Sequence, residues 1–107
     1  MLINPETNNT IWYHSTPKER LDSILKEGLR INSAPTFETG GPYPWIYVST
    51  VPFDPDNQEL ILLQIDLRDI PEERAGWPFG DRWQLRVFTD IPAKYISILR
   101  REGGTYG

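Results

Sequence analysis

The sequence contains one histidine, and the residues around it suit a polar binding site. His14 ends a short β-branched and aromatic segment, Ile11 to His14, and Thr16-Pro17 comes almost directly after it. We expect the segment to be a strand and Thr16 to begin a helix. An imidazole at a strand end, beside the free N–H groups of a helix start, can face a polar or anionic ligand. The alternative is an ordinary histidine whose ring is satisfied by a neighbouring group.

A second candidate is Tyr47, in the segment Ile46-Tyr47-Val48-Ser49-Thr50, which we expect to be another strand. Side chains alternate along a strand, so Tyr47 and Ser49 share one face while Ile46 and Val48 share the other. The tyrosine then lies on the more polar face, where a cleft can use it. The alternative is a strand aromatic that packs on the core.

Several other chemistries lack the residues they need. The chain has no cysteine, which excludes disulfides, thiolate metal sites and a cysteine nucleophile. A single histidine cannot build a zinc site of the His and Cys type. No serine lies in a nucleophile-elbow sequence, and Gly40-Gly41 stands alone rather than in a phosphate-binding pattern. The adjacent Glu72 and Glu73 are better explained as a solvated turn than as an acid–base pair.

The composition is that of one acidic domain. A length of 107 residues fits a single core, and 11 Lys and Arg against 15 Asp and Glu give a formal net charge of −4. This balance argues against binding a nucleic-acid backbone by bulk charge. No apolar run approaches the roughly 20 residues of a membrane span, and the N-terminus does not have the order of a secretory signal. We therefore expect a cytoplasmic protein with no membrane partner and no metal.

One helix and several strands are expected to position these residues. Thr16-Pro17-Lys18-Glu19 predicts a capping box, followed by a helix over about residues 17–27 that ends at Gly28. That helix should pack through Leu21, Ile24 and Leu25. Strands are predicted at 11–14, 46–50, 60–67, 83–88 and 96–99, loops at 33–45 and 70–82, and a loose lead-in at 1–10.

The connections between the later strands are too short for helical crossovers, which parallel strands usually need. We therefore predict an α+β domain with a mostly antiparallel or mixed sheet and one main N-terminal helix.

The order of these motifs resembles the ADP-ribosyltransferase superfamily. Trp12-Tyr13-His14-Ser15-Thr16, followed by a helix that reads Leu-Asp-Ser-Ile-Leu-Lys-Glu-Gly-Leu, is similar to the opening of that family. The segment 46–50 is similar to its next strand, and Gln84-Leu85-Arg86-Val87 with Ile91-Pro92 and Tyr95-Ile96 to its late element. The resemblance covers about residues 11–99 and is closest to compact branches: DNA-modifying toxin enzymes, RNA 2′-phosphotransferases and small phage-type effectors.

The resemblance implies a single ADP-ribosyltransferase-like domain over residues 1–107, with a split sheet whose cleft binds NAD as a substrate. It implies that His14 hydrogen-bonds the adenosine ribose and that Tyr47 stacks on the nicotinamide ring. It also implies that Ser15, Thr16 and Ser49 contribute to NAD binding.

Gln84 falls where the family usually has a glutamate that holds the nicotinamide ribose 2′-hydroxyl. Breaking the nicotinamide–ribose bond passes through an oxocarbenium-like state, which a nearby carboxylate stabilises. A glutamine keeps the hydrogen bond but not the charge, and losing such a contact costs on the order of 10²–10³ in rate. Asp81, three residues upstream, is the first candidate to supply that charge.

The resemblance therefore predicts an NAD-dependent ADP-ribosyltransferase-like protein that transfers ADP-ribose to a macromolecule, either protein or nucleic acid. One alternative is a non-catalytic NAD-binding, nucleotide-binding or protein-interaction module on the same fold, and another is a plain structural domain. An RNA 2′-phosphotransferase-like enzyme ranks lower, because that branch gathers several arginines around its cleft and the arginines here are scattered along the sequence.

Overall fold

In the part of the chain that the structure describes, six antiparallel strands form one sheet. The computed structural model of the chain describes residues 1–31, 45–52, 59–77 and 83–100. In these ranges one α-helix, α1 (Leu21–Glu27), accompanies the sheet, and 3₁₀ turns lie at Lys18–Arg20, Glu72–Arg74 and Ala93–Tyr95. The predicted α+β class is confirmed. The strands are β1 (Ile11–Pro17), β2 (Ile46–Ser49), β3 (Leu60–Asp66), β4 (Ala75–Gly76), β5 (Gln84–Val87) and β6 (Ile96–Arg100). Their order in the sheet is β4-β5-β2-β1-β3-β6.

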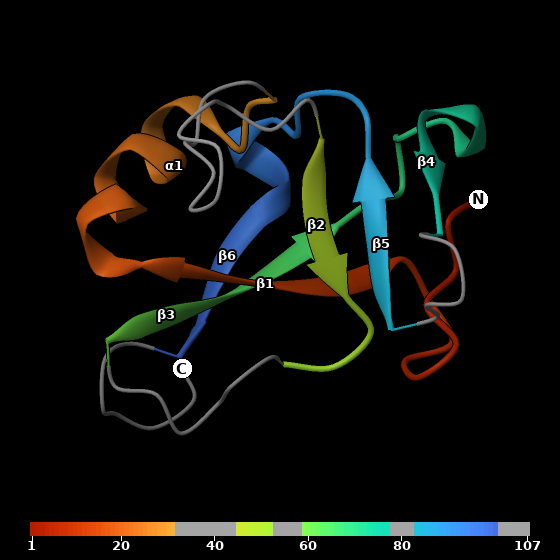
Figure 1. The fold of residues 1–107 in the computed structure, drawn as a ribbon, viewed down its shortest axis with the longest axis horizontal. Helices are drawn as coiled ribbons and strands as arrows, with labels where there is room; N and C mark the ends of the chain where they lie inside the picture. The colour runs from red at the N-terminus through yellow and green to blue at the C-terminus, as the bar shows by residue number, and fades with distance from the viewer. Residues whose placement is uncertain (32–44, 53–58, 78–82, 101–107) are drawn as a thin grey trace.

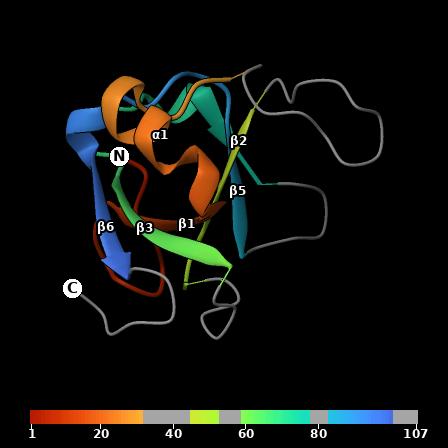
Figure 2. The ribbon, with the colours of Figure 1, turned by 90° about the vertical axis from the view of Figure 1, so that its left-hand side faces the viewer.

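The sheet has two halves that meet between β1 and β2. Strand β1 pairs with β3 along its whole length, but it joins β2 at one register pair, Tyr13 with Ser49. On the other side, β2 pairs with β5 over its full length. Figure 1 shows β2 and β5 running across the direction of β1. In Figure 2, α1 lies in front of β1, with β6 to one side and β2 and β5 to the other.

The two faces of the sheet differ because apolar residues alternate with polar ones along its strands. One face carries the core, in which α1 contributes the buried side chain of Ile24. The core residues on the strands are Trp12, Ile46, Val48, Ile61, Leu63, Ile65, Leu85, Val87 and Ile96. The opposite face of β2 and β5 carries the side chains between these positions, and these are mostly polar.

The helix starts later than the sequence predicts, and the predicted capping box is wrong. Strand β1 continues to Pro17, and neither the following 3₁₀ turn nor α1 has a side-chain cap. Thr16 pairs with Ile61 of β3 and its side chain is buried, so it cannot turn to cap a helix. Ile24 packs into the core as predicted, whereas Leu25 is 41% exposed, which contradicts the predicted helix face.

The predicted helix end at Gly28 is confirmed. Its N–H donates to the carbonyl of Ile24, and its φ of +84° lies in the region that favours glycine. A Cβ at this position would lie 2.3 Å from the carbonyl oxygen of Ile91. This close approach lets Leu29, just beyond the glycine, exchange backbone hydrogen bonds with Ile91 and bury its side chain.

The first ten residues are not the loose lead-in that their composition predicts. Asn4 is fully buried, and its side-chain amide donates to the carbonyls of Ile11 and Thr50. Its side-chain oxygen accepts from the backbone N–H of Glu6, in a local turn. The indole N–H of Trp12 also donates a hydrogen bond to the carbonyl of Leu2. Hydrogen bonds therefore hold the N-terminal segment against the start of β1 and the residue that follows β2.

Candidate functional site

His14 is hydrogen-bonded to the main chain of Tyr47, so two predicted site residues meet at the split of the sheet. The Nδ1 atom of His14 lies 2.7 Å from the carbonyl oxygen of Tyr47. A carbonyl can only accept, so Nδ1 carries the proton and donates it. In the neutral ring this leaves Nε2 unprotonated, as a hydrogen-bond acceptor. This hydrogen bond is a second link between β1 and β2, in addition to their one register pair.

The surroundings of His14 favour the neutral ring. Burial lowers its pKa from the usual value near 6.5, and the positive charge of Arg20 lowers it further. The hydrogen bond to Tyr47 acts in the opposite direction but does not outweigh the burial. At neutral pH the side chain therefore presents an uncharged acceptor rather than a cation.

Three predicted residues lie together on the polar face of β2 and β5. Tyr47 pairs with Arg86 and Ser49 pairs with Gln84, and directly opposed residues of antiparallel strands share a face. We call these four residues the β2–β5 face. Arg86 was not singled out from the sequence, although its spacing of two from Gln84 on an alternating strand is a signal that could have found it.

The side chain of His14 does not belong to the β2–β5 face by strand alternation. On β1 it alternates with Tyr13 and shares a face with the buried Trp12 and Thr16. Its observed contact with Tyr47 is through the main chain and not through the phenol ring. The prediction that both side chains bind one ligand stays a prediction.

The predicted hydroxyl-bearing residues differ in their surroundings. Ser49 is 4% exposed, and its hydroxyl lies 2.6 Å from the carbonyl oxygen of Val51 and 3.3 Å from that of Tyr13, so it supports the junction of β1 and β2. Thr16 is buried, and Ser15 is half-buried. Asp81 lies outside the described residues.

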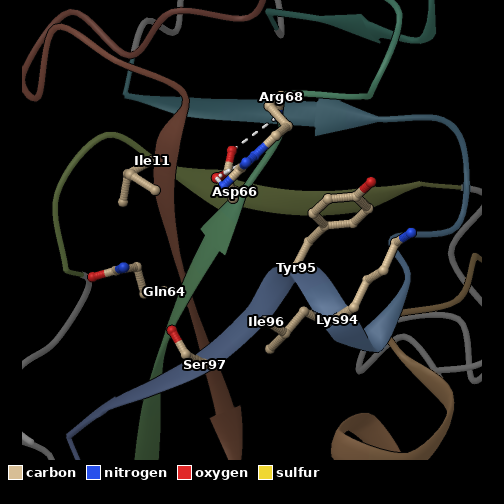
Figure 3. Close-up of a pocket in the computed structure, with 8 residues that line it drawn as sticks. All are labelled: Ile11, Gln64, Asp66, Arg68, Lys94, Tyr95, Ile96 and Ser97. Carbon is tan, nitrogen blue, oxygen red and sulfur yellow. Dashed lines mark hydrogen bonds and ion pairs between the residues drawn. The ribbon is translucent and has the colours of Figure 1, made fainter.

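A separate polar pocket of about 270 Å³ lies on the other half of the sheet, and none of the predicted site residues lines it. Figure 3 shows the guanidinium of Arg68 beside Asp66, which it contacts through Nε at 2.8 Å and Nη2 at 2.6 Å. The hydroxyl of Tyr95 donates to Asp69. The charges of Asp66 and Arg68 are thus paired with each other. The lining residues are Ile11, Gln64, Asp66, Arg68, Lys94, Tyr95, Ile96 and Ser97.

Comparison with known proteins finds no matching family model and no related curated protein. In the described ranges, no helix has the length and apolar character needed to cross a membrane. The same ranges contain no cluster of three or more side chains able to hold a metal ion.

Proposed function

We propose that this protein is an NAD-dependent enzyme of the ADP-ribosyltransferase type, which acts in the cytoplasm and transfers ADP-ribose to a protein or nucleic acid. The observation that carries the proposal is the state of His14. Its Nδ1 is fixed by the Tyr47 carbonyl and its pKa is lowered, so Nε2 is held as an acceptor at the split of the sheet. A ribose hydroxyl is a donor that suits such an acceptor.

The β2–β5 face supports the remaining roles. Tyr47 offers an aromatic ring on which the nicotinamide can stack, and the side-chain amide of Gln84 can hold the ribose 2′-hydroxyl. Gln84 lies directly opposite Ser49, two register pairs from Tyr47 along β2 and on the same face of the sheet. The two contacts are therefore close enough to act on one nicotinamide riboside.

In the proposed reaction the bond between the nicotinamide nitrogen and the ribose C1′ breaks, and its electron pair leaves with nicotinamide. A nucleophilic atom of the acceptor bonds to C1′ and gives up its proton to solvent. The positive charge that develops on the ribose needs a carboxylate nearby, and Gln84 cannot provide one. We assign that role to Asp81.

A second candidate is a binding module that holds NAD or another nucleotide without cleaving it. The observation in its favour is the β2–β5 face itself, whose four residues include no carboxylate. Such a protein would bind the ligand saturably and release no nicotinamide.

The test combines NAD calorimetry with an assay of nicotinamide release in the presence of cell lysate. An enzyme should bind NAD and release nicotinamide, whereas a binding module should only bind. The variant His14→Ala should weaken NAD binding by about 10- to 100-fold, because a hydrogen bond to a buried ligand group is lost. The exposed Ser23→Ala on α1 serves as the control. If the wild-type protein shows no response to millimolar NAD, the proposal is wrong.

A further inference from the structure

Arg86 is half-buried on the β2–β5 face and forms no ion pair with a carboxylate of the described residues. Its Nε is buried and has no hydrogen-bond acceptor. Within the described part of the chain, the arginines that form ion pairs are Arg30 and Arg68. Folded proteins pair nearly all their buried donors, because leaving one unsatisfied is destabilising, and more so for a charged group. The protein itself therefore leaves the Nε of Arg86 unsatisfied, and the guanidinium can bind an acceptor from outside the chain.

The orientation of this guanidinium is set by an aromatic support. Its Cζ lies 4.7 Å from the ring centre of Trp45, a cation–π contact. Trp45 is itself held by edge-on contacts with Tyr47 and Phe88, at centroid distances of 6.1 and 6.3 Å. The arginine is thus arranged before any ligand arrives, which reduces the entropy lost on binding.

The chemistry of the surroundings indicates which acceptor fits. A guanidinium presents parallel N–H groups that match the oxygens of a phosphate. Arg86 also lies directly opposite Tyr47, whose ring can contact a flat heterocycle. We propose that Arg86 binds the phosphate of a nucleotide whose base or nicotinamide ring lies against Tyr47. This site goes beyond the proposed function, because it needs a nucleotide phosphate but neither NAD nor its cleavage.

Calorimetry with two matched pairs of probes tests the site. Nicotinamide mononucleotide is compared with nicotinamide riboside, and AMP with adenosine, so that each pair differs only in the phosphate. In the wild-type protein at least one phosphorylated probe should bind about tenfold or more tightly than its partner. Arg86→Gln should abolish this preference. Arg68→Gln should keep it, because Arg68 already pairs with Asp66 on the other half of the sheet.

Equal affinities within both pairs, or a phosphate preference that survives Arg86→Gln, would overturn the assignment. If Arg86→Gln does not fold, Arg86→Lys replaces it and should lose part of the preference, because it keeps the charge without the planar fork. A phosphate preference in the AMP pair alone would support the Arg86 site while counting against nicotinamide binding. Failure of the proposed function is thus distinguishable from failure of this site.

Stability without ligand is the second measurement. If Arg86 serves a ligand, Arg86→Met should leave the urea midpoint of unfolding close to the wild-type value, because the Nε of Arg86 makes no hydrogen bond in the folded protein. A much lower midpoint would show that Arg86 is a structural residue and would also overturn the assignment.

Discussion

The imidazole of His14 donates a hydrogen bond to the backbone carbonyl of Tyr47 over 2.7 Å, across the boundary at which the two halves of the sheet separate. The bond selects one tautomer and turns the other ring nitrogen into an acceptor. Because the pKa of His14 is lowered, this arrangement has a measurable consequence for stability.

We expect the stability of the protein to fall as the pH drops from 7.5 to 5.5. The pKa of His14 in the folded protein lies below its unfolded value near 6.5, so the unfolded chain takes up the proton first. The contribution of the neutral ring is complete above that value and is lost below it, by at most about 1.4 kcal/mol per pH unit. Urea unfolding at both pH values measures it. His14→Gln should flatten the dependence, and an equally steep response in this variant would contradict the assignment to His14.

Removal of the Asn4 side chain should destabilise the fold by about 2–4 kcal/mol. Asn4→Ala removes the amide hydrogen bonds to the carbonyls of Ile11 and Thr50 and the side-chain oxygen that holds the N-terminal turn. Thermal or urea unfolding gives the value. Glu6→Ala provides the control, because this neighbour is exposed and bonds Asn4 through its main chain only. Equal stability of the two variants would show that the N-terminal segment is not fastened as described.

Gly28→Ala should cost at least about 1–3 kcal/mol of unfolding free energy, since a backbone with a φ of +84° and a ψ of −175° is accessible almost only to glycine. The collision of its Cβ with the carbonyl oxygen of Ile91 adds to the strain. Leu25→Ala, on the exposed side of the same helix, should stay within about 1 kcal/mol of the wild type. A Gly28→Ala protein as stable as Leu25→Ala would rule out the close contact with Ile91.

If the protein is instead the binding module, Gln84→Glu should produce slow release of nicotinamide from NAD where the wild type shows none, because it places a carboxylate next to the ribose. Arg86, on the same face, helps to keep this carboxylate ionised. Gln64→Glu on β3 makes the same chemical change on the other half of the sheet and should have no such effect.

Asp81→Asn should abolish nicotinamide release while NAD affinity stays nearly unchanged, the pattern of lost transition-state stabilisation. The assay follows NAD turnover in parallel with calorimetry. If the wild type turns over NAD and both Asp81→Asn and Gln84→Glu behave like it, the third catalytic position has been misplaced.

Local patterns in the sequence were enough to predict much of the framework. Alternation and β-branched content predicted the strands that contain His14, Tyr47 and Gln84, with ends that differ from the observed ones by a few residues at most. Gly28 was predicted to end the helix, because only glycine suits the backbone needed there. These signals depend on neighbours within a few residues, so they can be read directly from the chain.

Contacts between distant residues decided the rest. Pairing with β3 extended β1 through Thr16 and removed the expected cap, and burial between the ends of β1 and β2 ordered Asn4 despite its polar, turn-rich surroundings. The tautomer of His14 and the unsatisfied Nε of Arg86 arise from partners that are far away in the sequence or missing altogether. Hydrogen bonding and desolvation act over a few ångströms in space whatever the sequence separation, so only the tertiary structure could establish these features.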